Sequence, residues 1–106
     1  MTRRCDPHRL LLRAVREKAE RDGLAEIVAT RSEAWASATF RGARHSLSLQ
    51  LDGDGAEDRA TRLGETLDAM EFRLPGHLVA DIALIARRSN PHGVSVEIEA
   101  LTLEDG

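Results

Sequence analysis

Apolar residues recur at helical spacing near the start of the chain. Between residues 7 and 22 they lie three or four positions apart and form one stripe. Asp6 is a good N-cap, and Pro7 suits the first helical position, where its missing N–H costs nothing. Gly23 can end the helix by adopting a positive φ. The stripe consists of Leu11, Leu12, Val15 and Ala19. The pattern predicts a helix over residues 7–22.

Residues 24–51 alternate between apolar and polar positions, which is typical of strands with one buried face. Turns at Gly42-Ala43 and Ser32-Glu33 would divide this segment into three antiparallel strands. Arg41 would then face Arg44, and Phe40 would face His45, a partly buried structural histidine. The apolar face would hold Ala34, Ala36, Ala38, Phe40, Leu47, Leu49 and Leu51. The opposite face would hold Trp35, Ser37, Thr39, Arg41, Arg44, Ser46, Ser48 and Gln50.

A second stripe of apolar residues predicts a helix over residues 56–70. Glu57 and Asp58 fall in its first turn, where the helix dipole favours acidic side chains. Gly64 inside this helix either marks a close crossing over the sheet or is incidental. The stripe consists of Ala56, Ala60, Leu63, Leu67 and Met70.

The last third of the chain again reads as strands, over residues 71–74, 77–87 and 94–104. Pro75-Gly76 indicates a turn, and residues 89–93 a loop. A five-residue loop pairs Ala86 with Val96, Leu84 with Ile98 and Ile82 with Ala100 on an apolar face. The opposite face would carry Val79, Asp81, Ala83, Ile85 and Arg87, with Ser95, Glu97, Glu99, Leu101 and Leu103.

These elements predict one α+β domain over residues 1–106, with the order α-βββ-α-βββ. Two amphipathic helices can cover one face of a mostly antiparallel six-stranded sheet and form a two-layer sandwich. The opposite face of the sheet would stay open. The pairing between the two halves of the chain is not specified by the registers within each half.

Composition narrows the function classes. The chain has 106 residues, is 42% hydrophobic and 31% charged, and carries a net charge of −3. A strongly basic fold for nucleic acid is therefore not indicated, and few aromatic residues are present to stack on bases. Fourteen arginines against one Lys18 suggest a GC-rich bacterial source. No segment has the length of a transmembrane helix, and a single cysteine forms no internal disulfide, so we expect a cytoplasmic protein.

The sequence contains no complete motif for a metal site, a cofactor site or catalysis. Cys5 and His8 have the spacing of half a zinc site, but no second cysteine exists. The stretch Asp52-Gly53-Asp54-Gly55 begins like a calcium loop, yet Glu57 stands where that loop needs glycine. No arrangement typical of nucleophilic catalysis is present. The sequence therefore predicts no cofactor and favours a non-catalytic protein.

The favoured function is a protein-interaction module, self-associating as a homodimer through the open sheet face or an edge strand. The candidate contact residues are Trp35, Arg41, Arg44, Val79, Ile85, Leu101 and Leu103. One alternative is a small-molecule-binding or enzymatic domain with a pocket between sheet and partner subunit, lined by His77, Asp81 and Arg87. A weaker alternative is anion or RNA binding through Arg9, Arg13, Arg16, Arg41 and Arg44.

Overall fold

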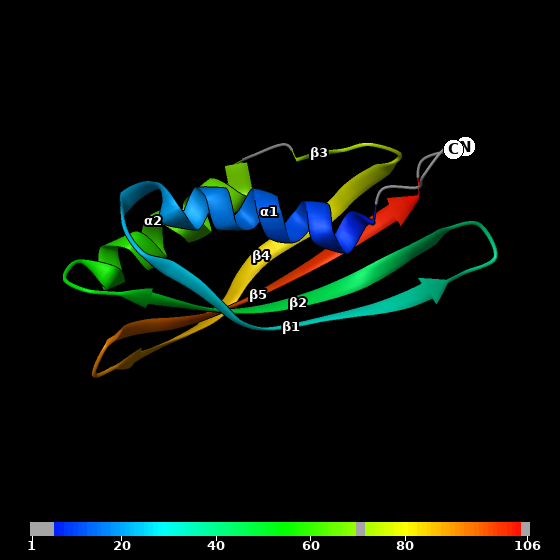
Figure 1. Ribbon diagram of the computed structural model, residues 1–106. Coiled ribbons are helices and arrows are strands. Elements are labelled where there is room, and N and C mark those ends of the chain that lie inside the picture. Colours follow the sequence, from blue (N-terminus) through cyan, green and yellow to red (C-terminus); the bar gives the residue numbers. More distant parts are fainter. Residues whose placement is uncertain (1–5, 70–71, 105–106) are drawn as a thin grey trace.

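A computed structural model describes residues 6–69 and 72–104 (Figure 1). Cys5, Met70 and Glu71, which entered the sequence interpretation, lie outside these ranges. The elements in chain order are α1 (Pro7–Ala19), a 3-10 turn (Glu20–Asp22), β1 (Ala25–Ala36), β2 (Arg41–Asp52), α2 (Ala56–Ala69), β3 (Arg73–Leu74), β4 (His77–Asn90) and β5 (Gly93–Glu104).

Helix α1 forms where the sequence predicts it. The Asp6 side chain accepts a hydrogen bond of 3.0 Å from the backbone N–H of His8, so it caps the helix, and Pro7 occupies the first turn. Arg16 pairs with Glu20 one turn later, at 2.7 Å. The chain tightens into a 3-10 turn before Gly23, which explains why helical periodicity extends to residue 22.

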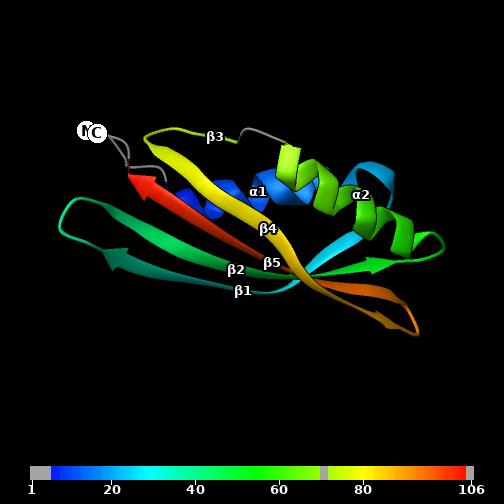
Figure 2. The same cartoon turned by 180° about the vertical axis from the view of Figure 1, so that it is seen from behind.

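The strands form one antiparallel sheet in the order β1-β2-β5-β4-β3. Four of these five strands are long, and β3 has only two residues. Both helices lie on the same side of it (Figures 1 and 2). The α+β class and the antiparallel pairing are confirmed. The six-stranded sheet is wrong, because residues 25–36 form a single strand that continues through the expected turn at Ser32-Glu33.

The first hairpin turns at residues 37–40 and not at Gly42-Ala43. The Ser37 hydroxyl accepts hydrogen bonds from the backbone N–H groups of Thr39 and Phe40, and this closes the turn without glycine. Gly42 instead lies within β2, where a Cβ atom would stand 1.9 Å from the carbonyl oxygen of Thr102. The glycine is thus required by a close approach of neighbouring backbone.

This shift in the turn changes the predicted cross-strand partners. Arg41 pairs with Ala36, and Arg44 pairs with Glu33, so the two arginines do not face each other. Phe40 lies in the turn and is 53% exposed, whereas the sequence placed it on the apolar face opposite His45.

The β4–β5 hairpin confirms two of the three predicted pairs, Ile82 with Ala100 and Leu84 with Ile98. Ala86 pairs with Glu97 and not with Val96. The predicted loop at residues 89–93 is a tight turn at residues 91–92, in which the Asn90 side chain accepts from the N–H groups of the two residues that follow Pro91. A bulge between Leu84 and Ala86 then absorbs the one-residue difference in register.

Two bulges in β4 also move side chains between the faces of the sheet. The register shifts between Val79 and Asp81 and again between Leu84 and Ala86. Val79 therefore pairs with Thr102 on the helix-covered side, and Arg87 pairs with Val96 on that side. The sequence placed both on the open face because strict alternation was assumed.

The core lies between the helices and the sheet. Leu11 and Val15 of α1 and Leu63 and Leu67 of α2 pack against inward-facing residues of β2 and β5. Those strand residues are Leu47, Leu49, Leu51, Val94, Val96, Ile98 and Ala100.

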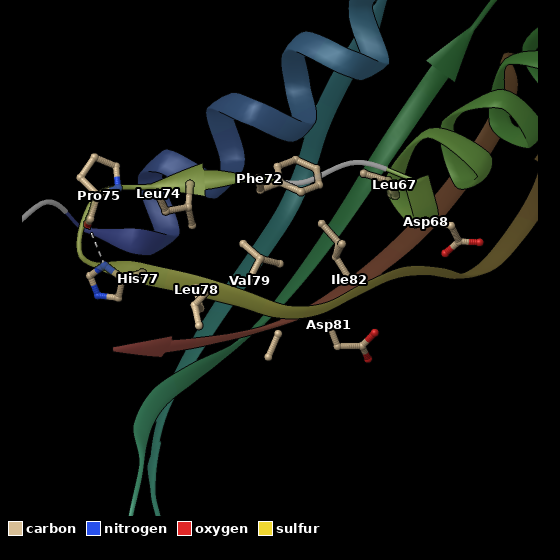
Figure 3. A pocket seen from close by; sticks show the side chains of 11 residues that line it. Leu67, Asp68, Phe72, Leu74, Pro75, His77, Leu78, Val79, Asp81 and Ile82 are labelled. Atoms are coloured by element: carbon tan, nitrogen blue, oxygen red, sulfur yellow. Dashed lines mark hydrogen bonds between the residues drawn. The ribbon is translucent and has the colours of Figure 1, made fainter. Parts of the chain in front are cut away.

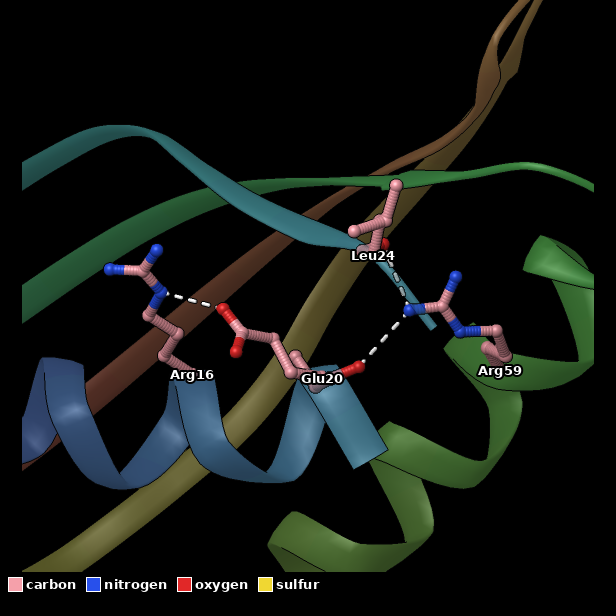
Figure 4. Close-up of polar contacts among 5 residues, drawn as sticks. Arg16, Glu20, Leu24 and Arg59 are labelled. Atoms are coloured by element: carbon pink, nitrogen blue, oxygen red, sulfur yellow. Dashed lines mark hydrogen bonds and ion pairs between the residues drawn. The ribbon is translucent and has the colours of Figure 1, made fainter. Parts of the chain in front are cut away.

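One arginine joins several elements at the edge of this core. Arg59 of α2 is 7% exposed, and its guanidinium donates to the carbonyl oxygens of Ala19, Leu24 and Asp52 at 2.9–3.1 Å. Figure 4 shows it reaching from α2 to the end of α1 and to the residue before β1. A single buried cation therefore satisfies the carbonyl groups of three segments.

Candidate functional site

The face of the sheet away from the helices is the candidate site. Side chains alternate along β2 and β5, and the buried set points to the helices. The other set points to a side on which no described helix or strand lies (Figures 1 and 2). The register aligns this second set into rows that cross the four long strands.

One row, near the β1–β2 turn, is apolar. It runs from Trp35 in β1 over Gly42 in β2 and Leu103 in β5 to Leu78 in β4. The indole lies over Gly42, since a Cβ atom there would be 3.2 Å from the Trp35 Nε1 atom. That nitrogen is buried without a hydrogen-bond partner among the described residues. Leu78 is 56% exposed, so the row has an unfilled apolar end.

The adjoining rows are charged. Glu33, Arg44, Leu101 and Asp81 form one row, and Arg31, Ser46, Glu99 and Ala83 form the next. All of these residues except Ala83 line a depression of about 380 Å³. Arg31 and Arg44 share β1 and β2 with Glu26 and Glu33, while Asp81, Glu97 and Glu99 share β4 and β5 with Arg88. The β1–β2 half of the face therefore carries mixed charge, and the β4–β5 half is the more acidic one.

The far end of the face is polar and hydrogen-bonded. Ser48 donates to the Glu97 carboxylate across β2 and β5 at 2.7 Å. Gln50, Asn90 and Ser95 bond to one another at 2.8–3.2 Å. These polar side chains already form hydrogen bonds with one another. Burial against a partner would therefore stabilise this end less than the apolar end.

The structure brings together four of the seven predicted contact residues. Trp35, Arg44, Leu101 and Leu103 share the open face. Arg41 lies on the opposite side of the sheet, because it alternates with Gly42. Val79 packs against the core, and Ile85 occupies the second bulge of β4 and is 55% exposed.

The three residues proposed to line a ligand pocket do not assemble. His77 and Asp81 both line a groove of about 790 Å³ between the end of α2 and the β3–β4 hairpin (Figure 3). Arg87 lies further along β4, where it donates to the Thr61 hydroxyl at 2.8 Å and pairs with Glu57 of α2. The expected polar lining is thus reduced to two residues.

The arginines considered for anion binding likewise form no common surface. Arg9, Arg13 and Arg16 lie on α1, on the helix side, and Arg16 pairs with Glu20. Arg44 faces the opposite side of the sheet. The sheet itself separates these cations, so one ligand cannot contact all of them.

A buried histidine pair was not found by sequence reasoning. The Nδ1 atoms of His8 and His45 lie 2.8 Å apart, and the outer nitrogens contact the hydroxyls of Thr30 and Thr102 at 2.6 and 2.9 Å. Burial, with smaller contributions from His8 and His77 and an opposing one from Asp6, lowers the pKa of His45 to about 4. The sequence placed His45 on the apolar face, but nothing in it indicated His8 as the partner.

Within the described ranges, no three His, Cys, Asp or Glu side chains could together hold a metal ion. In those same ranges no helix is both long and apolar enough to cross a membrane. Comparison of the chain with family models, with curated proteins and with solved structures finds no significant match.

Proposed function

We propose that this protein is a non-catalytic module that forms a homodimer through the open face of its sheet. The observation that carries the proposal is the apolar row Trp35–Gly42–Leu103–Leu78, which continues directly into charged rows on a face without a partner element. An aromatic residue beside aliphatic ones, bordered by arginine and carboxylates, is typical of interaction surfaces.

The arrangement of the rows favours one symmetry. A two-fold axis parallel to the strands, passing between β2 and β5, would place β2 of one copy over β5 of the other. Each row of one copy would then face the same row of the second copy, so that Trp35 lies near Leu78 of the second copy. An axis across the strands would instead set the apolar row against the polar end at Gln50.

Charge does not select this axis. With the axis along the strands, Arg44 would lie over Leu101 and Arg31 over Ala83 of the second copy, while Glu33 would lie over Asp81. The apolar row is therefore the feature that favours the axis along the strands.

The area of the face is sufficient. Four strands spaced about 4.8 Å apart and about 40 Å long cover roughly 750 Å². A stable interface buries about 800 Å² on each partner. Two such sheets would pack with their strands aligned to within about 30°.

Light scattering on Leu101→Glu and Leu78→Glu variants tests the proposal. The unaltered protein is expected to show a mass near twice the 11.7 kDa of one chain. Each variant should raise the dimer dissociation constant at least about tenfold, because it buries an unpaired carboxylate. Leu24→Glu is the matched control, since Leu24 is 77% exposed and precedes β1. A monomer at high micromolar concentration would refute the dimer.

Thiol cross-linking tests the direction of the axis. In a Cys5→Ser background, a Ser46→Cys chain and a Glu99→Cys chain are mixed and treated with a short bifunctional maleimide, because facing sheets lie about 10 Å apart, too far for a direct disulfide. An axis along the strands brings these two positions of different copies together, so a mixed cross-linked dimer should form. An Arg31→Cys chain that cross-links to itself more readily than this pair would indicate the other axis.

The proposal retains the cytoplasm as the location, because a chain with one cysteine forms no internal disulfide.

A further inference from the structure

We infer a second interaction site: the groove beside β4 accepts an extended segment of a partner protein, in which apolar side chains alternate with basic ones. The groove has a volume of about 790 Å³. Its walls are the last turn of α2, residues 72–75 and the first part of β4 (Figure 3). It lies at an edge of the sheet and is separate from the apolar row of the open face except at Leu78.

One edge of β4 has no described strand beside it along most of its length. β3 pairs with β4 only at Arg73–Leu78 and Leu74–His77. From Val79 onward, β4 is paired with β5 on one side, and no other described strand pairs with it. Backbone N–H and C=O groups on such an edge can bond to an added strand, which is a common mode of peptide recognition.

The groove crosses that edge from one face of the sheet to the other. Val79 and Ile82 pair with Thr102 and Ala100 on the helix side, whereas Asp81 pairs with Leu101 on the open side. All three β4 residues line the groove. A groove lined by residues of both sheet faces must pass along the edge of the strand. An occupant therefore meets the unpaired backbone of β4, which favours an extended chain over a compact molecule.

The lining of the groove combines an apolar wall with two carboxylates. Leu67, Leu74 and Ile82 are buried and form an apolar wall. Asp68 of α2 and Asp81 of β4 are exposed and lie on opposite sides of β4 in Figure 3, Asp68 on the helix side and Asp81 on the open side. None of the lining residues with a described side chain is Lys or Arg. An apolar side chain next to a basic one complements this lining.

A titration with the acetylated, amidated peptide Val-Lys-Leu-Lys-Val tests the inference by isothermal titration calorimetry and hydrogen exchange. Binding should slow exchange of the amides at residues 79–84. Asp68→Lys should weaken binding at least about fivefold, since an attractive contact of up to about 1 kcal/mol becomes repulsive. Glu65→Gln, on the same helix but outside the groove, is the matched control and should leave binding unchanged. A peptide with N-methylated backbone should not bind, because it cannot pair with β4.

Several outcomes would overturn the inference. Equal binding of Val-Glu-Leu-Glu-Val would show that charge does not select the occupant. Equal binding of the N-methylated peptide or of hexylamine would show a site for small apolar cations and not for a strand. Absence of binding at 1 mM peptide would remove the site altogether. All titrations are repeated on the Leu101→Glu variant, so the outcome does not depend on whether the protein dimerises through its open face.

Discussion

The Nδ1 atoms of His8 and His45 lie 2.8 Å apart although 37 residues separate them in the chain. The ring planes differ by 9°. Thr30 contacts the outer nitrogen of His8, and Thr102 contacts that of His45 and donates to the Ala43 carbonyl oxygen at 3.5 Å. These hydrogen bonds connect the first turn of α1 to β1, β2 and β5.

The protonation states follow from this chain of contacts. If Thr102 donates to Ala43, its oxygen accepts the Nε2 proton of His45. His45 Nδ1 then accepts the Nδ1 proton of His8, whose Nε2 accepts from Thr30. A proton on the His45 Nδ1 atom would meet the proton that His8 donates there. The contact with His8 therefore holds His45 in its neutral form.

We predict that stability falls as the pH falls through the range 6.5 to 4. The pKa of His45 is about 4 in the folded protein and 6.5 without burial, so the unfolded chain binds the proton first. The contribution is complete above pH 6.5 and decreases by about 3 kcal/mol by pH 4. Urea unfolding at pH 7.5, 6.5, 5.5 and 4.5 measures it. His45→Gln should flatten the profile, whereas His92→Gln, in an exposed turn, should leave it unchanged.

Removal of the other ring should both destabilise the fold and weaken its pH dependence. His8→Ala leaves the buried His45 Nδ1 without a partner, which costs about 1–3 kcal/mol at pH 7.5. It also removes a charge and some burial that lower the pKa of His45. The same urea series should therefore show a lower free energy of unfolding and a smaller slope below pH 6.5. An unchanged slope would mean that His8 does not influence His45.

Arg59 should be among the residues most sensitive to substitution. Arg59→Met leaves the carbonyl groups of Ala19, Leu24 and Asp52 without their donor, at a cost of about 2–4 kcal/mol. Arg59→Lys should be intermediate, because one ammonium group does not reproduce the fork of the guanidinium. Thermal and urea unfolding measure both. Arg9→Met, on the exposed side of α1, should change stability by less than about 0.5 kcal/mol.

Two glycine substitutions should act in opposite directions. Gly64→Ala adds a Cβ atom 3.8 Å from the Leu84 Cβ, an ordinary contact, so it should stabilise α2 by about 1 kcal/mol. Gly42→Ala adds one 1.9 Å from the carbonyl oxygen of Thr102 and should destabilise by about 3 kcal/mol, because the sheet backbone must move. Calorimetric melting compares them. A destabilising Gly64→Ala would indicate a tighter crossing of α2 over β4.

The local pattern of the sequence determined the two helices, the antiparallel strands and the side chains that β2 and β5 direct toward the helices. Those features depend on residues that are close in the chain. Examples are a helix cap such as Asp6, apolar residues repeated every three or four positions, and apolar and polar residues that alternate along a strand. Trp35, Leu101 and Leu103 could be assigned to the open face for the same reason.

Tertiary structure alone decided the strand count, the faces of Val79 and Arg87, and the His8–His45 pair. Each bulge in β4 inverts the alternation beyond it, and its position depends on how β5 and α2 pack, not on β4 alone. Glycine at position 42 is typical of a turn, but here it is required because the backbone of β5 at Thr102, 60 residues later in the chain, leaves no room for a Cβ atom. Contacts of this range leave no periodic signal, because they are set by which elements come together and not by the spacing of residues within one.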